Sequence, residues 1–397
     1  MLGTVNGRLL DPSNALTVKG VAPRPTVYVG PRIVISAARE ADDVLALLRQ
    51  AADLLGWEVH RDQSFPASRV RSRRRLADAP VGLGLSRYVV SVQSSKATVA
   101  PDGWVLLQQA RAKFGLEAMQ GVGLDHVLFP TSEVVSNPYH DSNPYHDSNP
   151  YHDSNPNHDS NPAGGYAIST YSRPGYGGRQ PIAFVGPRPH RRAATELTGR
   201  RPVVAILDTG CGAHPWLDDV VRKGIQLDGM PIGYTDADTD PEQLGDHAGP
   251  LDGSIDELSG HGTFIAGLVH QACPDADIAV WRVVNSTGPI VESDFIEALT
   301  RIAELVRRHS EGETGGLAID VLNLSMGYYH ETPEDVLFDP TMRNLLELMG
   351  RCGTAVVCSA GNDATARPLY PAAFCPWDDG TGTPTSPDCV PVVSWGR

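Results

Sequence analysis

Four short motifs in the second half of this 397-residue sequence carry side chains that can do chemistry together. They supply a carboxylate, an imidazole, a hydroxyl and an amide, in the order Asp208-Thr209-Gly210, Gly260-His261-Gly262, Ser325-Met326-Gly327 and Ser359-Ala360-Gly361-Asn362. A histidine held in place by a neighbouring group can act as a general base, and an amide donor can stabilise an oxyanion. The four motifs together therefore indicate general-base chemistry.

Asp208 follows the apolar run PVVAIL (202–207), which is typical of a strand buried on both faces. A carboxylate at the carboxyl end of a parallel strand faces the crevice where α/β proteins bind ligands. Asp-Thr-Gly also occurs in aspartic proteases, where two carboxylates share a proton. That alternative needs a second such triplet or a symmetric dimer, and the sequence holds no second triplet.

His261 stands at the start of an apolar helix. The positive end of the helix dipole favours the neutral imidazole, which is the form that a general base needs. Gly260 and Gly262 allow a close approach of backbone. Taken alone, this motif is equally compatible with a capped helix that carries a surface histidine.

The last two motifs follow predicted strands. Ser325, Met326 and Gly327 can offer an open strand edge to an extended peptide, with Gly327 leaving room for a side chain. The amide of Asn362 can donate to a developing oxyanion. Each motif alone is also compatible with an ordinary turn after a strand.

In this order, on alternating strands and helices, the motifs resemble those of the subtilisin-like serine proteases (peptidase S8), over about residues 200–396. The resemblance implies a doubly wound, mostly parallel α/β sheet and a peptide or protein substrate. It implies that Asp208 orients His261, that His261 is the general base and that Asn362 donates to the oxyanion. Ser325, Met326 and Gly327 would line the substrate cleft, and the reaction needs no cofactor.

One part of the family pattern is not present. The nucleophile of the family stands in Gly-Thr-Ser-x-Ala-x-Pro, which does not occur in these 397 residues. Ser386 is rejected as a substitute because prolines flank it where a helix must start. We therefore interpret residues 199–397 as a subtilisin-like protease domain that is incomplete at its C-terminus, and we expect the chain to be inactive. The alternative is a non-enzymatic relative that binds a peptide or a partner.

The elements after residue 199 alternate between strand and helix, which predicts a parallel sheet covered by helices. Expected helices are 264–272, 293–310 with Ser293 as N-cap, and most of 334–350; expected strands are 202–207, 277–284, 319–325, 354–360 and 389–395.

Residues 1–135 predict a small α+β domain in the order β-α-β-β-α-β, which fits a ferredoxin-like sheet. The expected strands are 26–35, 57–61, 88–94 and 125–129, and the expected helices are 40–56 and 104–114, with Asp102 as N-cap. Subtilisin-like enzymes often carry a prosegment of this fold, so the resemblance implies either a prosegment or a permanent accessory domain.

Residues 136–198 form a low-complexity linker between these domains. Its first part repeats SNPYHD with a period of six, and proline in each unit blocks a helix. Histidines recur at His140, His146, His152 and His158, where weak metal capture competes with the simpler interpretation as an extended chain.

The net charge of −14 is unevenly distributed. Residues 1–195 hold 21 Lys and Arg against 16 Asp and Glu, whereas residues 196–397 hold 12 against 31. Opposite signs favour docking of the first half on the second, and the overall charge argues against nucleic acid as a partner. No apolar run reaches the roughly 18 residues that span a bilayer, which argues against a membrane protein. The N-terminus shows no signal-peptide pattern, so we expect a cytoplasmic protein, with secretion as the alternative.

Two further features leave alternatives open. The acidic stretch with Asp236, Asp238, Asp240, Asp246 and Asp252 can hold Ca²⁺ or form a solvated loop. Six cysteines form no CxxC pair, which argues against a zinc ribbon. Cys375 and Cys389 can be joined as a disulfide or remain free thiols.

Overall fold

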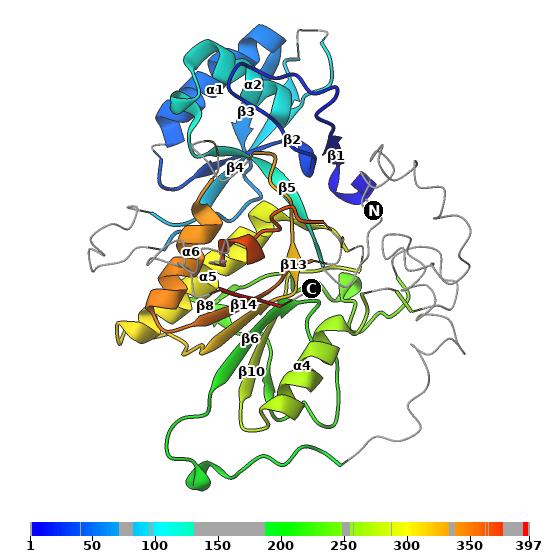
Figure 1. The fold of residues 1–397 in the computed structure, drawn as a ribbon, viewed down its shortest axis with the longest axis vertical. Helices are drawn as coiled ribbons and strands as arrows, with labels where there is room; N and C mark the ends of the chain where they lie inside the picture. The colour runs from blue at the N-terminus through cyan, green and yellow to red at the C-terminus, as the bar shows by residue number, and fades with distance from the viewer. Residues whose placement is uncertain are drawn as a thin grey trace.

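The computed structural model shows two α/β units, labelled in Figure 1. It describes residues 2–39, 41–70, 82–94, 96, 98–130, 187–247, 255–256, 258–286, 288–332, 337, 339–361, 363, 365–375 and 392–395. We call the described part of 2–130 the N-terminal unit and that of 187–395 the C-terminal unit. The predicted linker falls mostly on residues outside this description, as do Asn362, Ser386 and Cys389.

The C-terminal unit is built on a parallel sheet. Its strands, in spatial order, are β15 (Val392–Trp395), β14 (Ala355–Ser359), β12 (Val321–Leu324), β6 (Val203–Asp208), β10 (Asp277–Arg282) and β7 (Val221–Arg222). All five pairings between these neighbours are parallel. The mostly parallel α/β sheet predicted from the sequence is confirmed. A short hairpin, β8 (Gln226–Leu227) and β9 (Met230–Pro231), lies apart from it.

Helices cover both faces of this sheet (Figure 1). On one face, Ile206 packs in a cluster with Ala266 of α4 (His261–Ala272). On the other, Leu207 packs in the large core with α5 (Glu292–Ser310) and α6 (Thr341–Arg351). Alternate residues of a strand point to opposite faces, so a strand buried on both sides must be apolar throughout, as β6 is.

Two predicted details of these helices are corrected by the structure. The helix expected over 334–350 begins only at Thr341, directly after Pro340, because a proline keeps the residue before it out of helical geometry. Ser293 is not the N-cap of α5; that position is Val291. The Ser293 hydroxyl instead donates to Asp125 Oδ2 at 2.9 Å.

The N-terminal unit has the element order β2 (Thr26–Ser36), α1 (Ala41–Leu55), β3 (Trp57–Arg61), β4 (Leu85–Val92), α2 (Gly103–Phe114) and β5 (Val122–Pro130). Its strands lie in the order β5-β2-β4-β3 with antiparallel pairings, and β1 (Gly7–Leu10) pairs with β2. Both helices pack on this sheet in one apolar cluster. Asp102 caps α2 as predicted, because its carboxylate accepts from Val105 N at 3.0 Å.

Strand β5 joins the two units. Beyond its pairing with β2 it runs antiparallel to β11 (Ile290–Val291) and to β13 (Met326–Gly327), both of the C-terminal unit. The pairs are Leu128 with Ile290, and Phe129 with Gly327. The strand edge at β13 is therefore covered by a segment of the same chain.

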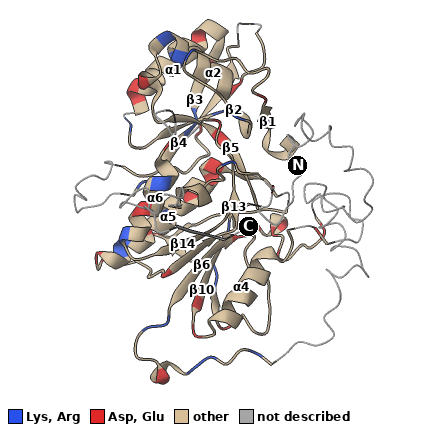
Figure 2. Ribbon diagram, viewed as in Figure 1, with Lys and Arg blue, Asp and Glu red and all other residues tan. Residues whose placement is uncertain are grey.

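Charged side chains add to this junction, and Figure 2 marks the charged positions of both units. Arg87 of β4 donates to Asp294 of α5 at 2.6 Å and to Asp62 at 2.8 Å. Glu297 of α5 accepts from Ser68 N at 2.7 Å. Because Arg87 and Glu297 are mostly buried, these contacts are stronger than exposed surface pairs.

The remaining short elements are 3₁₀ turns. They cover Leu2–Val5, Glu117–Met119, Ala194–Glu196, Ala237–Thr239 and Ala372–Phe374. No helix in the described part of the chain is both long enough and apolar enough to cross a membrane.

A matched pair of phenylalanines tests the placement of α5. Phe295 is fully buried in the large core, whereas Phe264 on α4 is 64% exposed. We expect Phe295→Ala to lower the free energy of unfolding by about 3–5 kcal/mol. Phe264→Ala should change it by less than about 0.5 kcal/mol. Urea denaturation followed by tryptophan fluorescence measures both, and equal effects would contradict the burial of α5.

Candidate active site

The structure brings Asp208 and His261 into direct contact. Asp208 is the last residue of β6 and is fully buried; His261 is the first residue of α4. His261 Nδ1 lies 2.7 Å from Asp208 Oδ1, a hydrogen-bond distance. The side chain of His261 keeps 19% exposure. The carboxylate can hold the ring through Nδ1, which leaves Nε2 as the nitrogen for proton transfer.

Glycine is required where the two motifs meet. A Cβ at Gly262 would lie 2.1 Å from the carbonyl oxygen of Gly210. The N–H of Gly262 donates to Thr209 Oγ1 at 2.8 Å. The backbone after the aspartate thus packs directly against the first turn of α4, and this contact sets the distance between Asp208 and His261.

The surroundings of His261 tune its basicity. Burial alone would lower the pKa of His261, but the hydrogen bond and charge of Asp208, with a further contribution from Glu242, raise it above its ordinary value. One carboxylate oxygen, Asp208 Oδ1, also accepts from Thr209 N at 2.8 Å. The imidazolium that forms after proton abstraction is therefore stabilised at this position.

Glu242 is a functional candidate that the sequence reasoning missed. Its carboxylate accepts from the hydroxyls of Thr209 and Thr263, one from each motif. Thr263 Oγ1 in turn accepts from Gly212 N at 2.6 Å. Glu242 thereby connects the turn after β6 with the first turn of α4. The available signal was a threonine one residue after Asp208 and another two residues after His261, because a hydroxyl that folding removes from water needs a partner.

Of the three residues predicted to line the substrate cleft, Met326 and Gly327 form β13 and Ser325 directly precedes it. Met326 is fully buried, and Ser325 Oγ accepts from Asn323 Nδ2 at 3.0 Å. A Cβ at Gly327 would lie 2.6 Å from Leu369 Cγ, so the room that this glycine leaves is filled by Leu369. Strand β5 pairs with both β13 residues.

The other site predictions are only partly covered. Asn362 lies outside the described residues, although Gly361 before it is described and adopts a left-handed φ of 92°. In the acidic stretch, Asp236 accepts from Asp238 N at 3.1 Å and Asp240 accepts from Glu242 N at 2.9 Å. Those two carboxylates stabilise local turns.

Fold and site together define the class: an α/β protein with a carboxylate-oriented histidine at the carboxyl edge of a parallel sheet. A sequence model of the subtilase family matches residues 199–384. Residues 199–384 are thus similar to the subtilase family, peptidase S8.

Curated relatives support this similarity. The thermophilic serine proteinase of Bacillus sp. (strain AK1) is 27% identical over 172 residues, which cover 43% of this chain and 35% of that protein. The major intracellular serine protease of Bacillus subtilis (strain 168) is 25% identical over 196 residues, 46% and 50% of the two chains. Subtilisin-like protease het-Q2 of Podospora anserina is 30% identical over 190 residues, 43% and 49%. The chain spans half or less of the length of these relatives.

Among solved structures, fervidolysin from Fervidobacterium pennivorans aligns with 91% of this chain and 43% of its own, at 14% identity and a TM-score of 0.38.

Replacement of Asp208 tests its effect on His261. Since the folded-state pKa of His261 is raised, its charge stabilises the fold below the ordinary pKa of 6.5, and this stability is lost as the pH rises through the folded value. We expect Asp208→Asn to lower the pKa of His261 and to remove this pH dependence. Histidine NMR titration and pH-dependent denaturation measure both effects. Asp53→Asn, on the distant helix α1, is the control, and an unchanged titration curve in Asp208→Asn would contradict the contact.

Two glycines of α4 form a second matched pair. Gly262→Ala places a Cβ against backbone, whereas a Cβ at Gly267 meets nothing within 4 Å. We expect Gly262→Ala to lower the free energy of unfolding by about 1–3 kcal/mol or more through overpacking. Gly267→Ala should raise it by roughly 0.5–1 kcal/mol, because alanine favours a helix interior. Thermal denaturation measures both, and a neutral Gly262→Ala would refute the close approach.

Proposed function

We propose that the C-terminal unit carries the histidine–carboxylate half of a serine endopeptidase site. The observation that carries this proposal is the 2.7 Å contact between Asp208 and His261 at the carboxyl edge of the sheet. Similarity to the subtilase family supports it. In this proposal His261 Nε2 takes the proton of a nucleophilic hydroxyl, and Asp208 stabilises the resulting imidazolium.

The remaining roles complete the proposed reaction. Asn362 donates to the oxyanion of the tetrahedral intermediate. Ser325 to Gly327 pair with the extended substrate, as β13 does with β5. No cofactor takes part in peptide hydrolysis itself, and calcium in the acidic stretch stays a separate prediction. The nucleophile motif does not occur in these 397 residues.

A second candidate function is peptide or partner binding without catalysis. The observation that favours it is the antiparallel pairing of β5 with β13 and with β11, in which an extended segment of this chain lies along both strands. Backbone hydrogen bonds along such an edge supply affinity without any nucleophile.

We further propose that the N-terminal unit is a ferredoxin-like domain that acts as a prosegment. Its strand order β5-β2-β4-β3, with antiparallel pairings throughout, supports the ferredoxin-like assignment. Its last strand covers the proposed substrate edge, as a prosegment would. A permanent accessory domain is the alternative, and cleavage in the linker distinguishes the two.

We propose that the protein acts in the cytoplasm on peptide or protein substrates. The names of two relatives support it, since both are described as intracellular serine proteases.

A polypeptide of these 397 residues should hydrolyse peptides only at background rate, because the hydroxyl nucleophile supplies the covalent step. Fluorogenic peptides measure this. Hydrolysis that a serine-directed phosphonate blocks and that His261→Ala abolishes would overturn the expectation. Reading the gene beyond the codon for Arg397 separates the two functions: a Gly-Thr-Ser-x-Ala-x-Pro segment there supports the protease, and its absence supports the binder.

Docking of the N-terminal unit is tested by cutting the linker within residues 136–162. We expect the two pieces to stay associated at low salt. Arg87→Gln should weaken the association at least about tenfold, because Asp294 loses a mostly buried partner. Arg49→Gln is the control, since the bond that Arg49 makes among the described residues, to Val59 O, lies within its own unit. Pieces that separate at low salt would contradict the prosegment proposal.

A further inference from the structure

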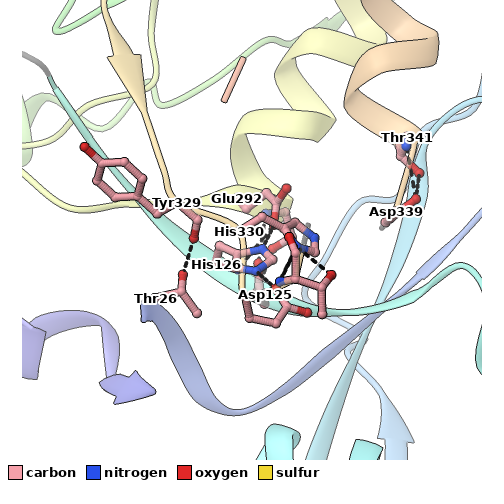
Figure 3. A network of polar contacts seen from close by, with 11 residues as sticks. Thr26, Asp125, His126, Glu292, Tyr329, His330, Asp339 and Thr341 are labelled. Carbon is pink, nitrogen blue, oxygen red and sulfur yellow. Dashed lines mark hydrogen bonds and ion pairs between the residues drawn. The ribbon is translucent and has the colours of Figure 1, made fainter. Parts of the chain in front are cut away.

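A cluster of buried histidine and glutamate side chains lies where the two units meet (Figure 3). His126 belongs to β5, Glu292 begins α5, and His330 and Glu331 follow β13. All four residues are at most 8% exposed, and Glu331 is fully buried. None of these residues takes part in the site described above.

The distances within the cluster are short. His126 Nδ1 lies 2.5 Å from Glu292 Oε2, and His126 Nε2 lies 2.6 Å from Glu331 Oε2. His330 Nδ1 lies 3.1 Å from the same oxygen of Glu331. One ligand-type atom from each of His126, His330 and Glu331 lies within 4.8 Å of the others. Across the described residues, no other group of three such side chains meets this criterion.

The donor set suits a metal ion. His330 Nδ1 lies 3.1 Å from Thr332 N and 3.2 Å from Thr332 O, so this nitrogen can accept from the first or donate to the second. A metal ligand must be unprotonated, and a bound ion would replace the contact with the Thr332 N–H. His126 presents one ring nitrogen to Glu292 and the other to Glu331. A ligating histidine commonly donates its second N–H to a carboxylate, which fixes the ring. Glu292 stands in that outer position.

The cluster also holds a buried carboxylate oxygen without a hydrogen-bond partner among the described atoms. This atom is Oε1 of Glu331. Asp125, which is fully buried close by, already has Arg32 and Ser293 as partners (Figure 3). A buried carboxylate is costly unless a cation or several donors compensate it.

We propose that His126, His330 and Glu331 bind a Zn²⁺ ion that bridges the N-terminal and C-terminal units, with Glu292 holding His126 from outside. Two imidazoles and a carboxylate are a zinc-type set, with a fourth position for water. Bonds of about 2.1 Å place tetrahedral ligand atoms roughly 3.4 Å apart. The pair of His330 and Glu331 is near this spacing, and the pair of His126 and Glu331 must open by less than about 1 Å. The proton between His126 and Glu331 leaves to solvent as the metal enters.

The bridge has a structural consequence. His126 comes from the N-terminal unit, and His330 and Glu331 come from the C-terminal unit. Gly327 of β13 lies three residues before His330 in the sequence. Removal of the metal should therefore loosen β5 from β13. This effect is independent of any peptidase activity.

The test uses the full chain without an affinity tag. Because the repeat histidines can chelate metal themselves, His140, His146, His152 and His158 are first replaced by asparagine. Metal content after dialysis against zinc is measured by inductively coupled plasma mass spectrometry, and thermal melting is recorded with zinc and with a chelator. We expect stoichiometric zinc and a melting temperature that falls when the metal is removed.

Variants assign the site. His330→Asn and, independently, Glu331→Gln should lose the zinc and the response to chelator, whereas His60→Asn, an exposed histidine of β3, should retain both. Co²⁺ in place of zinc should give a visible spectrum without thiolate bands, which excludes the free cysteines as ligands. The proposal would be overturned if the chain binds no zinc, or if both variants bind as much zinc as the unmutated chain. Protonated His126 would then be the cation between the two glutamates. If one of these two variants fails to fold, the other still tests the site.

Discussion

The candidate site depends on the register of the parallel sheet, that is, on which residues of neighbouring strands pair with one another. In a parallel sheet all carboxyl ends lie at one edge. Leu324 of β12 pairs with Leu207 of β6 on one side and with Cys358 of β14 on the other. The residues that follow, Asp208 and Ser325, therefore emerge side by side. A shift of one residue in either pairing would turn these side chains to the opposite face of the sheet.

The features that were predicted correctly from the sequence are those that depend on residues only a few positions apart. Strand β3 has the predicted bounds, and Asp102 caps α2 as expected, because alternation of apolar residues and capping chemistry act over a few positions. The parallel sheet followed from strand–helix alternation. The contact between Asp208 and His261 was implied by the motifs, and the distance of 2.7 Å agrees with that implication.

The rest depended on contacts between distant segments. Ser293 was expected to cap its own helix, but Asp125, 168 residues earlier in the chain, takes its hydroxyl. Glu242 lies in a stretch that read only as acidic, and its role depends on two threonine hydroxyls brought together by folding. The pairing of β5 with β13 could not be predicted from either segment, because neither sequence specifies which strand it pairs with.

Because β5 and β13 belong to one chain, their pairing is intramolecular. A strand linked in the same chain is present at an effective concentration in the millimolar range for a short flexible linker, and lower for a longer one. Few backbone pairs then suffice, and β5 makes two with β13 and two with β11. Pro130 stands opposite Met326 at the end of β5, and proline has no N–H to donate, so the pairing ends there. The edge is thus held by short pairings and by buried charges such as Arg87. In the proposed peptidase, a peptide that binds at this edge has to displace both.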